Sequence, residues 1–200
     1  MKNTVQVSIL IAFALSGCAA RKPPSQQLNA ASLANYEDPD GYSVLTQLLS
    51  KEAGGWRNRT VRISALTTRE NPDSITSFEK CMQVPDEFTE AANNFRQITK
   101  KSYLLQDRFG SDARFQIVDR PGLDRSRARS AANARSVEEL ISGGTYFVSP
   151  VGFDDAKTHA IVRINYICGG TCGGGKYHLL EKSQDGWKEV EPKSICFWQY

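Results

Sequence analysis

Histidine is scarce in this sequence, since only His159 and His178 occur among 200 residues. Hydrolytic sites commonly join a nucleophile, a histidine base and a group that orients the base. The sequence contains no nucleophile elbow and no other local catalytic motif. We therefore expect a protein without catalytic residues and without a cofactor.

A hydrolase remains the alternative, because its parts can be chosen from the sequence. The nucleophile would be a serine or a reduced cysteine, the base a histidine and the orienting group an aspartate. The candidates are Ser149, Cys172, His159, His178, Asp154 and Asp155.

The sequence also lacks an apolar run long enough to cross a membrane. The longest run, from Val5 to Leu15, is far shorter than the roughly 20 residues that a bilayer crossing requires. It follows Lys2 and leads into Leu15-Ser16-Gly17-Cys18. This pattern predicts a secretory signal peptide over residues 1–17 that ends in a lipobox.

The lipobox resembles that of bacterial lipoproteins, which implies a diacylglycerol thioether on Cys18 and acylation of its amine. At about 0.8 kcal/mol per buried methylene, two or more acyl chains make an effectively permanent anchor. Ala19 stands where inner-membrane retention signals typically have Asp, which favours the outer membrane, with the domain facing the periplasm. Residues 18–35 then form a flexible tether, and residues 36–200 form a single globular α+β domain.

Acidic residues are absent from residues 1–35, which contain three basic side chains. The net charge of +3 therefore belongs to the leader and tether, and residues 36–200 carry 22 basic and 22 acidic side chains. A neutral domain is not typical of nucleic-acid binding. The arginines between Arg120 and Arg135 predict either a basic surface for a phosphate-bearing lipid, a cell-wall polymer or an acidic envelope protein, or an exposed loop or polar helix whose arginines are solvated.

Cysteine is also limited to five positions, of which four remain after the lipidated Cys18. An even number in an exported domain favours disulfides. Of three possible pairings we favour Cys168 with Cys172, which the glycine-rich turn can bring together, and Cys81 with Cys196. The chain-entropy model assigns about 2 kcal/mol to the short loop and about 5 kcal/mol to the long one.

A metal or redox site is the competing interpretation of the same cysteines. The spacing of Cys168 and Cys172 is within the range of zinc sites, and His159 and His178 could complete the ligands. Export to an oxidising compartment favours the disulfide, so we expect no metal.

The C-terminal third has the strongest strand pattern. Residues 159–167 alternate with the period of two that a half-buried strand shows. A second strand is predicted over residues 177–182, after an irregular glycine-rich tip, and a third after the turn at Asp185-Gly186. Together they predict an antiparallel meander.

Helices are predicted near residues 40–49, capped by Asp38 or Asp40, and over residues 86–100. A capping box at Ser136 predicts a short helix to Ile141. Further strands are predicted at residues 61–65, 102–105 and 113–118. The fold class is α+β, a mostly antiparallel sheet with a C-terminal β-meander covered by two or three helices, the first two on one face.

Several short motifs resemble a bacterial family of hypothetical proteins. The chain has Ser149, Val151 to Asp154, Cys168 to Gly175 with Tyr177, Leu179 to Lys182 and Gly186 to Lys188. Family members typically have S-x-V-G-F-N, C-G-x-x-C-G-x-G-x-Y, L-L-x-K and G-x-W-K in this order. The resemblance covers residues 40–190, departs at Asp154 and over residues 119–144, and implies one domain with no assigned catalytic residue.

These observations predict a lipid-anchored envelope protein with a non-catalytic binding or structural role. Replacement Cys18→Ser should remove the acyl anchor, so that the protein stays uncleaved or becomes soluble. Detergent phase partitioning of cell fractions measures this directly. Unchanged partitioning of the variant into the detergent phase would contradict the lipoprotein prediction.

Overall fold

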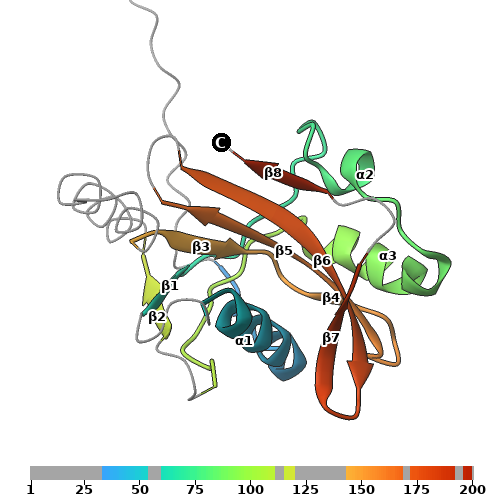
Figure 1. Ribbon diagram of the computed structural model, residues 1–200, viewed down its shortest axis with the longest axis horizontal. Helices are drawn as coiled ribbons and strands as arrows, with labels where there is room; N and C mark the ends of the chain where they lie inside the picture. Colours follow the sequence, from blue (N-terminus) through green and yellow to red (C-terminus); the bar gives the residue numbers. More distant parts are fainter. Residues whose placement is uncertain are drawn as a thin grey trace, which may run out of the picture. The chain divides into compact units, whose positions relative to one another are not determined.

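A mixed β-sheet forms the centre of the structure, a computed structural model (Figure 1). The structure describes residues 33–53, 60–110, 115–119, 143–168, 172–191 and 196–199. All of them lie within one compact unit, Ala31–Tyr200.

Eight strands are present in the described residues, in the order β2-β1-β3-β5-β6-β7, with β4 paired to β5 and β8 paired to β6. Their bounds are β1 Val61–Ser64, β2 Phe115–Val118, β3 Thr145–Val148, β4 Gly152–Phe153, β5 His159–Ile167, β6 Gly173–Ser183, β7 Gly186–Val190 and β8 Phe197–Gln199. β1 pairs in parallel with β2 and β3, and every other pair is antiparallel. The predicted meander is formed by β3, β5, β6 and β7, and the α+β fold class is confirmed.

The helices in the described residues are α1 Pro39–Ala53, α2 Phe78–Cys81, the 3-10 turn η2 Asp86–Phe88 and α3 Thr89–Ile98. Asp38 begins α1, because its Oδ1 accepts the backbone N–H groups of Asp40 at 3.0 Å and Gly41 at 3.4 Å. The apolar stripe predicted for α1 is buried, namely Tyr42, Leu45, Leu48 and Leu49. The stripe predicted over residues 86–100 is buried at Phe88, Ala91, Ala92 and Phe95 and partly buried at Ile98. Both helices therefore dock on the sheet through the residues that sequence periodicity selects.

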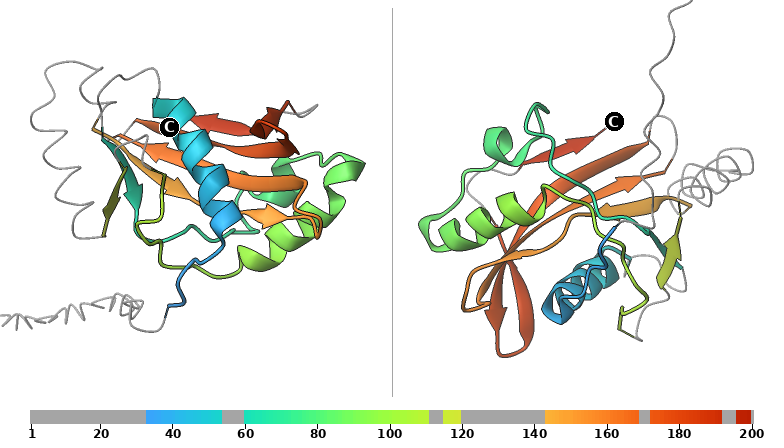
Figure 2. Two further views of the ribbon diagram at one scale, coloured as in Figure 1. Left: turned by 90° about the horizontal axis from the view of Figure 1, so that it is seen from below. Right: turned by 180° about the vertical axis from the view of Figure 1, so that it is seen from behind.

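The two long helices lie on opposite faces of the sheet, so the prediction that both cover one face was wrong. Ala160, Val162 and Ile164 of β5 pack in the core under α1, whereas Ile161 packs in the core under α3. In Figure 1, α1 lies on one side of the β5–β6 hairpin, and α2 and α3 lie on the other; Figure 2 shows the same arrangement from two further directions. β5 is consequently buried on both faces over Ala160–Ile164 rather than half-buried.

The glycines before Tyr177 belong to β6, not to the irregular tip predicted from the sequence. Gly174 and Gly175 pair with β5 on one side and with β8 on the other. A Cβ on Gly174 would lie 2.6 Å from the carbonyl oxygen of Trp198, and one on Gly175 would lie 2.7 Å from the Trp198 ring. Glycine is required here because β8 approaches closely.

Two smaller predictions also differ from the structure. Residues 102–105 do not form a strand, and only Leu104 makes isolated bridges, to Asn35 and Leu66. The turn between β6 and β7 is formed by Gln184 and Asp185, while Gly186 begins β7 with φ of 114°. A positive φ at that position is readily adopted only by glycine.

Two disulfides are present, and they join the pairs favoured from the sequence. Cys81 at the end of α2 bonds to Cys196 before β8, with Cα atoms 5.3 Å apart. Cys168 after β5 bonds to Cys172 before β6, with Cα atoms 5.2 Å apart. The backbone N–H of Cys168 also donates to the carbonyl of Cys172 at 2.9 Å, so the hairpin is closed by a covalent and a hydrogen bond.

Several predictions fall outside the described residues. They are the signal peptide, Cys18, residues 18–32 of the tether, the Arg120–Arg135 stretch and the helix predicted to end at Ile141. Within the described part of the chain, none of the helices has the length and apolar character needed to cross a bilayer.

The contact between α3 and β4 yields a stability prediction. A Cβ on Gly152 would lie 2.5 Å from the backbone nitrogen and Cα of Phe95, so Gly152→Ala must push the helix from the sheet. We expect a loss of about 1–3 kcal/mol in the free energy of unfolding, measured by urea titration.

The matched control is Gly110→Ala. Its added Cβ would meet only the Thr46 methyl group, at 3.3 Å, and should change stability by less than about 0.5 kcal/mol. Equal effects of the two substitutions would show that the α3–β4 contact is not tight.

Candidate functional site

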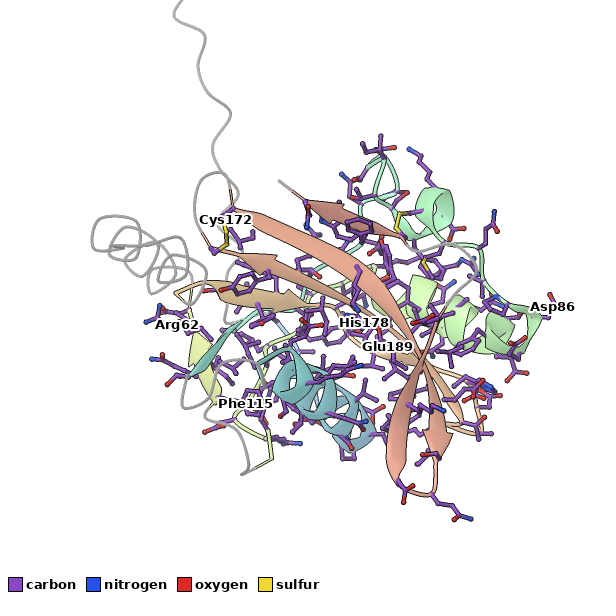
Figure 3. The ribbon with its side chains drawn as sticks, in the orientation of Figure 1. Arg62, Asp86, Phe115, Cys172, His178 and Glu189 are labelled. Atoms are coloured by element: carbon purple, nitrogen blue, oxygen red, sulfur yellow. A yellow bond between two sulfur atoms is a disulfide. The ribbon has the colours of Figure 1, made fainter. Side chains whose placement is uncertain are left out.

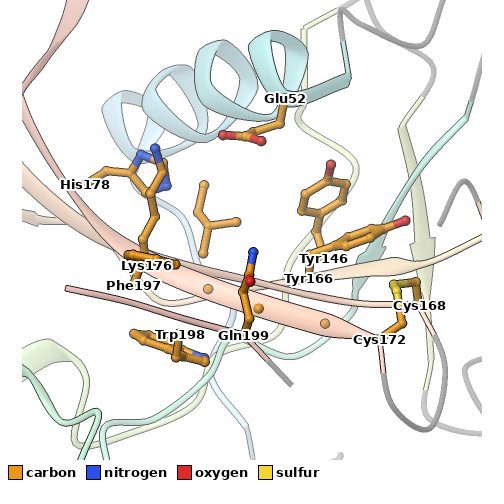
Figure 4. Close-up of a pocket in the computed structure, with 14 residues that line it drawn as sticks. Glu52, Tyr146, Tyr166, Cys168, Cys172, Lys176, His178, Phe197, Trp198 and Gln199 are labelled. Atoms are coloured by element: carbon orange, nitrogen blue, oxygen red, sulfur yellow. A yellow bond between two sulfur atoms is a disulfide. The ribbon is translucent and has the colours of Figure 1, made fainter. Parts of the chain in front are cut away.

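The candidate site is a pocket of about 430 Å³ on the face of the sheet that α1 covers. It lies near the C-terminal end of α1 and over strands β3, β5, β6 and β8 (Figure 4). The side chains used in the argument below are Glu52, Tyr146, Tyr166, Lys176, His178, Phe197 and Gln199, and the Cys168–Cys172 disulfide lies at one end.

Strand register builds the floor of the pocket. Tyr146 pairs with Tyr166, Tyr166 with Gly174, and Gly174 with Gln199, so these four residues form one row across four strands. Paired residues share a face of the sheet. Gly174 has no side chain, and the row therefore contains a gap between the tyrosine rings and Gln199.

The tyrosine pair forms one wall. The ring centroids of Tyr146 and Tyr166 are 4.7 Å apart and the rings are tilted by 44°. The Tyr166 hydroxyl accepts the backbone N–H of Gly144 at 3.1 Å. Burial, and then the nearby Tyr166 and Glu52, raise the pKa of Tyr146, so its phenol stays protonated and can donate a hydrogen bond.

A charged cluster stands at the opposite end of the pocket. Glu189 of β7 binds His178 Nδ1 through Oε1 at 2.9 Å and Lys176 Nζ through the same oxygen at 3.0 Å. Its Oε2 contacts Lys51 Nζ at 3.3 Å. Figure 3 shows His178 and Glu189 near each other on the adjacent strands. The Glu189 carboxylate is therefore shared by two ammonium groups and one imidazole.

The cluster determines the protonation state of Glu189. The pKa of Glu189 lies well below its usual range, chiefly because His178 hydrogen-bonds to the carboxylate. Burial acts in the opposite direction, and the hydrogen bond from Lys176 lowers the pKa further. Glu189 is thus ionised at neutral pH. His178 is 1% exposed, so its buried imidazole holds the Glu189 carboxylate in place.

Sequence reasoning missed Glu189, Glu52 and the tyrosine pair as site residues. A signal for Glu189 existed, because it lies two residues after Trp187 on β7 and so shares the inward face of that aromatic residue. No signal placed Glu52 or the tyrosines together, since their proximity depends on the pairing of β3 with β5 and on the position of α1.

Asp154 and His159 are the only pair of the proposed hydrolase residues that the described structure brings into contact. Asp154 Oδ2 binds His159 Nδ1 at 2.9 Å and Thr158 Oγ1 at 2.6 Å. Its Oδ1 accepts the backbone N–H groups of Thr158 at 2.7 Å and His159 at 2.9 Å. The carboxylate therefore closes the β4–β5 turn, in which Lys157 has φ of 52°.

The remaining residues proposed for a hydrolase make no such contact in the part of the chain that the structure describes. Ser149 is buried; its Oγ donates to the Pro150 carbonyl at 2.8 Å and accepts the Arg163 N–H at 2.9 Å. Cys172 is in a disulfide. Neither candidate nucleophile contacts a histidine among the hydrogen bonds of the described residues, and Asp155 is exposed.

The ligand set predicted for a metal is also separated. His159 pairs with Glu181, and His178 pairs with Val162, which places the two histidines on opposite faces of the sheet. His159 and Cys168 stand at opposite ends of β5, about 30 Å apart along an extended strand. Within the described residues, no group of three or more His, Cys, Asp or Glu side chains could hold a metal ion.

An ion pair lies on the α3 face of the sheet, opposite the face that carries the pocket. Arg163 Nη1 contacts Glu70 Oε1 at 2.7 Å, and the Tyr177 hydroxyl donates to Glu70 Oε2 at 2.9 Å. Phe78 N–H of α2 donates to the same Oε2 at 3.2 Å. The network holds α2 on the sheet, and α2 in turn holds β8 through the Cys81–Cys196 disulfide.

A second hollow of about 610 Å³ lies along α1. It is lined by one face of that helix together with Arg108 and Gly110, and its side chains are mostly short and polar. It lacks the convergence of aromatic and titratable groups from several elements that marks a ligand site. We therefore take the pocket over β6 as the candidate site.

The Asp154 contacts generate a prediction for acid stability. Burial would raise the pKa of Asp154, but the hydrogen bonds from His159 and Thr158 outweigh it and lower the pKa to about 2 from 3.8. A lowered pKa stabilises the fold above pH 4, and this contribution, about 2 kcal/mol, is lost as the pH falls from 4 to 2. Urea unfolding at pH 7, 4 and 2 should show this loss in the native chain and a smaller loss in Asp154→Asn.

Asp155→Asn is the control, because this neighbouring carboxylate is exposed. Its pH dependence should match that of the native chain. A native-like pH profile for Asp154→Asn would contradict the assigned role of Asp154.

Comparisons with protein-family models, with curated proteins and with solved structures found no match to this chain. The resemblance to a bacterial family, described above from short motifs, stays a prediction. Function therefore has to be inferred from the chemistry of the pocket.

Proposed function

We propose that this protein is a lipid-anchored protein of the cell envelope whose folded domain binds a ligand without chemically converting it. Its ligand site is the pocket over β6. The acyl chains on Cys18 would hold the domain at the membrane, and residues 18–35 would let it reach a ligand in the periplasm.

The observation that carries the proposal is the state of the reactive side chains at the pocket. Cys172 is bonded to Cys168, His178 Nδ1 is bonded to Glu189, and Tyr146 has a raised pKa. Among the described residues, the pocket lining contains no serine or threonine, and both of its cysteines are joined in the disulfide, so no hydroxyl or thiol nucleophile of these kinds lies beside the His178 imidazole. Side chains from α1, β3, β5, β6 and β8 nevertheless converge there, as expected for binding.

The pocket is also held rigid from both ends. The Cys168–Cys172 disulfide joins β5 to β6 beside the tyrosines, and the Cys81–Cys196 disulfide holds β8. A preorganised site loses less conformational entropy when a ligand binds. Two disulfides also fit an oxidising compartment, which supports the envelope location.

Photo-crosslinking in intact cells tests the proposal. A photoreactive amino acid at Gln199, exposed at the pocket, should capture a ligand or partner of defined mass. The same amino acid at Glu87, exposed on η2 and outside the pocket, should not.

The captured material should be released unaltered, since no conversion is expected. Absence of a crosslink at 199, the same products at 199 and 87, or release of a chemically modified ligand would overturn the proposal.

A further inference from the structure

The pocket combines flat apolar surfaces with groups that both donate and accept hydrogen bonds. The Tyr146–Tyr166 pair lies on one side of the gap at Gly174, and Phe197 of β8 lies at the rim. Phe197 is 61% exposed, which is unusual for a phenylalanine. The Phe197 side chain is therefore accessible to a ligand in the pocket.

Aromatic faces of this kind suit a ring whose own faces are apolar. A sugar ring presents C–H groups on its faces and hydroxyl groups around its edge. Stacking places the C–H groups against aromatic rings, which carry partial negative charge on their faces. The hydroxyl groups then point sideways and need both donors and acceptors.

The edge of the pocket supplies both kinds of group. The Glu52 carboxylate accepts hydrogen bonds, the Gln199 amide donates and accepts, and the protonated Tyr146 phenol can donate. An acyl chain in the same place would remove these groups from water without replacing their hydrogen bonds, which is unfavourable.

The charges around the pocket balance. The described lining contains one carboxylate, Glu52, and one ammonium group, Lys176. Outside the lining, Glu189 contacts both Lys176 and Lys51. The pocket thus presents no excess of one sign for an ionic ligand. Its volume of about 430 Å³ is within the range of small-molecule sites.

We infer that the pocket binds an uncharged saccharide, with one sugar ring stacked on the aromatic side chains and its hydroxyl groups bonded to Glu52 and Gln199. This inference rests on the proposed binding function and specifies its ligand class. A glycan polymer of the envelope would present such rings in a chain.

Saturation-transfer NMR and calorimetric titration of the full lipidated chain in nanodiscs test the inference. The ligands are cellobiose, maltose and N,N′-diacetylchitobiose, with octanoate and a glucuronate disaccharide as apolar and anionic comparisons. At least one neutral disaccharide should bind, with the saturation transferred mainly to its ring C–H protons.

Two matched pairs of variants assign the site. Phe197→Ala should weaken binding about tenfold, whereas Ile75→Ala, which removes the other exposed large hydrophobic side chain of the described residues, should not. Glu52→Leu should weaken binding, Glu52→Gln should retain most of it because the amide still accepts hydrogen bonds, and Glu87→Leu should leave it unchanged.

The outcomes separate the two proposals. Binding of octanoate or of the glucuronate disaccharide alone, sensitive to Phe197→Ala, would overturn the saccharide inference and leave the binding function in place. Neutral disaccharide binding that is insensitive to Phe197→Ala and Glu52→Leu would overturn the assignment of this pocket.

If none of these ligands binds while the photoreactive residue at position 199 still captures a partner in cells, the saccharide inference fails and the binding function stands. If there is no ligand binding and no crosslink, the saccharide inference and the binding function both fail.

Discussion

The two-sided burial of β5 is the constraint on which the rest of the structure depends. Its side chains alternate between faces, and apolar residues occupy both faces from Ala160 to Ile164. Exposing either set would cost roughly 1.5–3 kcal/mol for each large aliphatic side chain. One helix cannot cover both faces, so α1 packs on one and α3 on the other. The sheet is therefore central rather than one wall of a two-layer fold.

The pocket arises beyond the apolar region that α1 covers. Past Ile164, β5 continues with Asn165 and Tyr166, and β6 has Gly174 opposite Tyr166. The missing side chain at Gly174 leaves space, and the close approach of β8 requires glycine at the same position. One residue thus serves the packing of the edge strand and the shape of the pocket. At the end of the pocket Glu189 neutralises one of its two lysine partners, and the Glu52 carboxylate offsets the charge of the other.

Much of the local structure could be predicted because local patterns encode it. The alternation over residues 159–167 matches β5, and the stripe of Phe88, Ala91, Ala92 and Phe95 is the buried face of η2 and α3. The turn before Trp187 was predicted one residue too late, because it is formed by Gln184 and Asp185. The glycines of β6 were misassigned to a turn, because glycine permits both turns and close contacts. Burial of β5 was underestimated because Arg163 and Asn165 suggested a solvated face, whereas Arg163 is buried against Glu70.

By itself the sequence determined the types of the longer elements α1, α3, β5, β6 and β7, the α+β class and the favoured cysteine pairing. These follow from periodicity, capping residues and the number and spacing of cysteines. Only the tertiary structure decided which face each helix covers and which residues form the pocket. Strand pairing joins Tyr146 to Tyr166 and Gly174 to Gln199, and it separates His159 from His178. The physical reason is that side-chain alternation determines which residues share a face within one strand. The register between strands and the docking of helices depend instead on contacts between residues far apart in the chain.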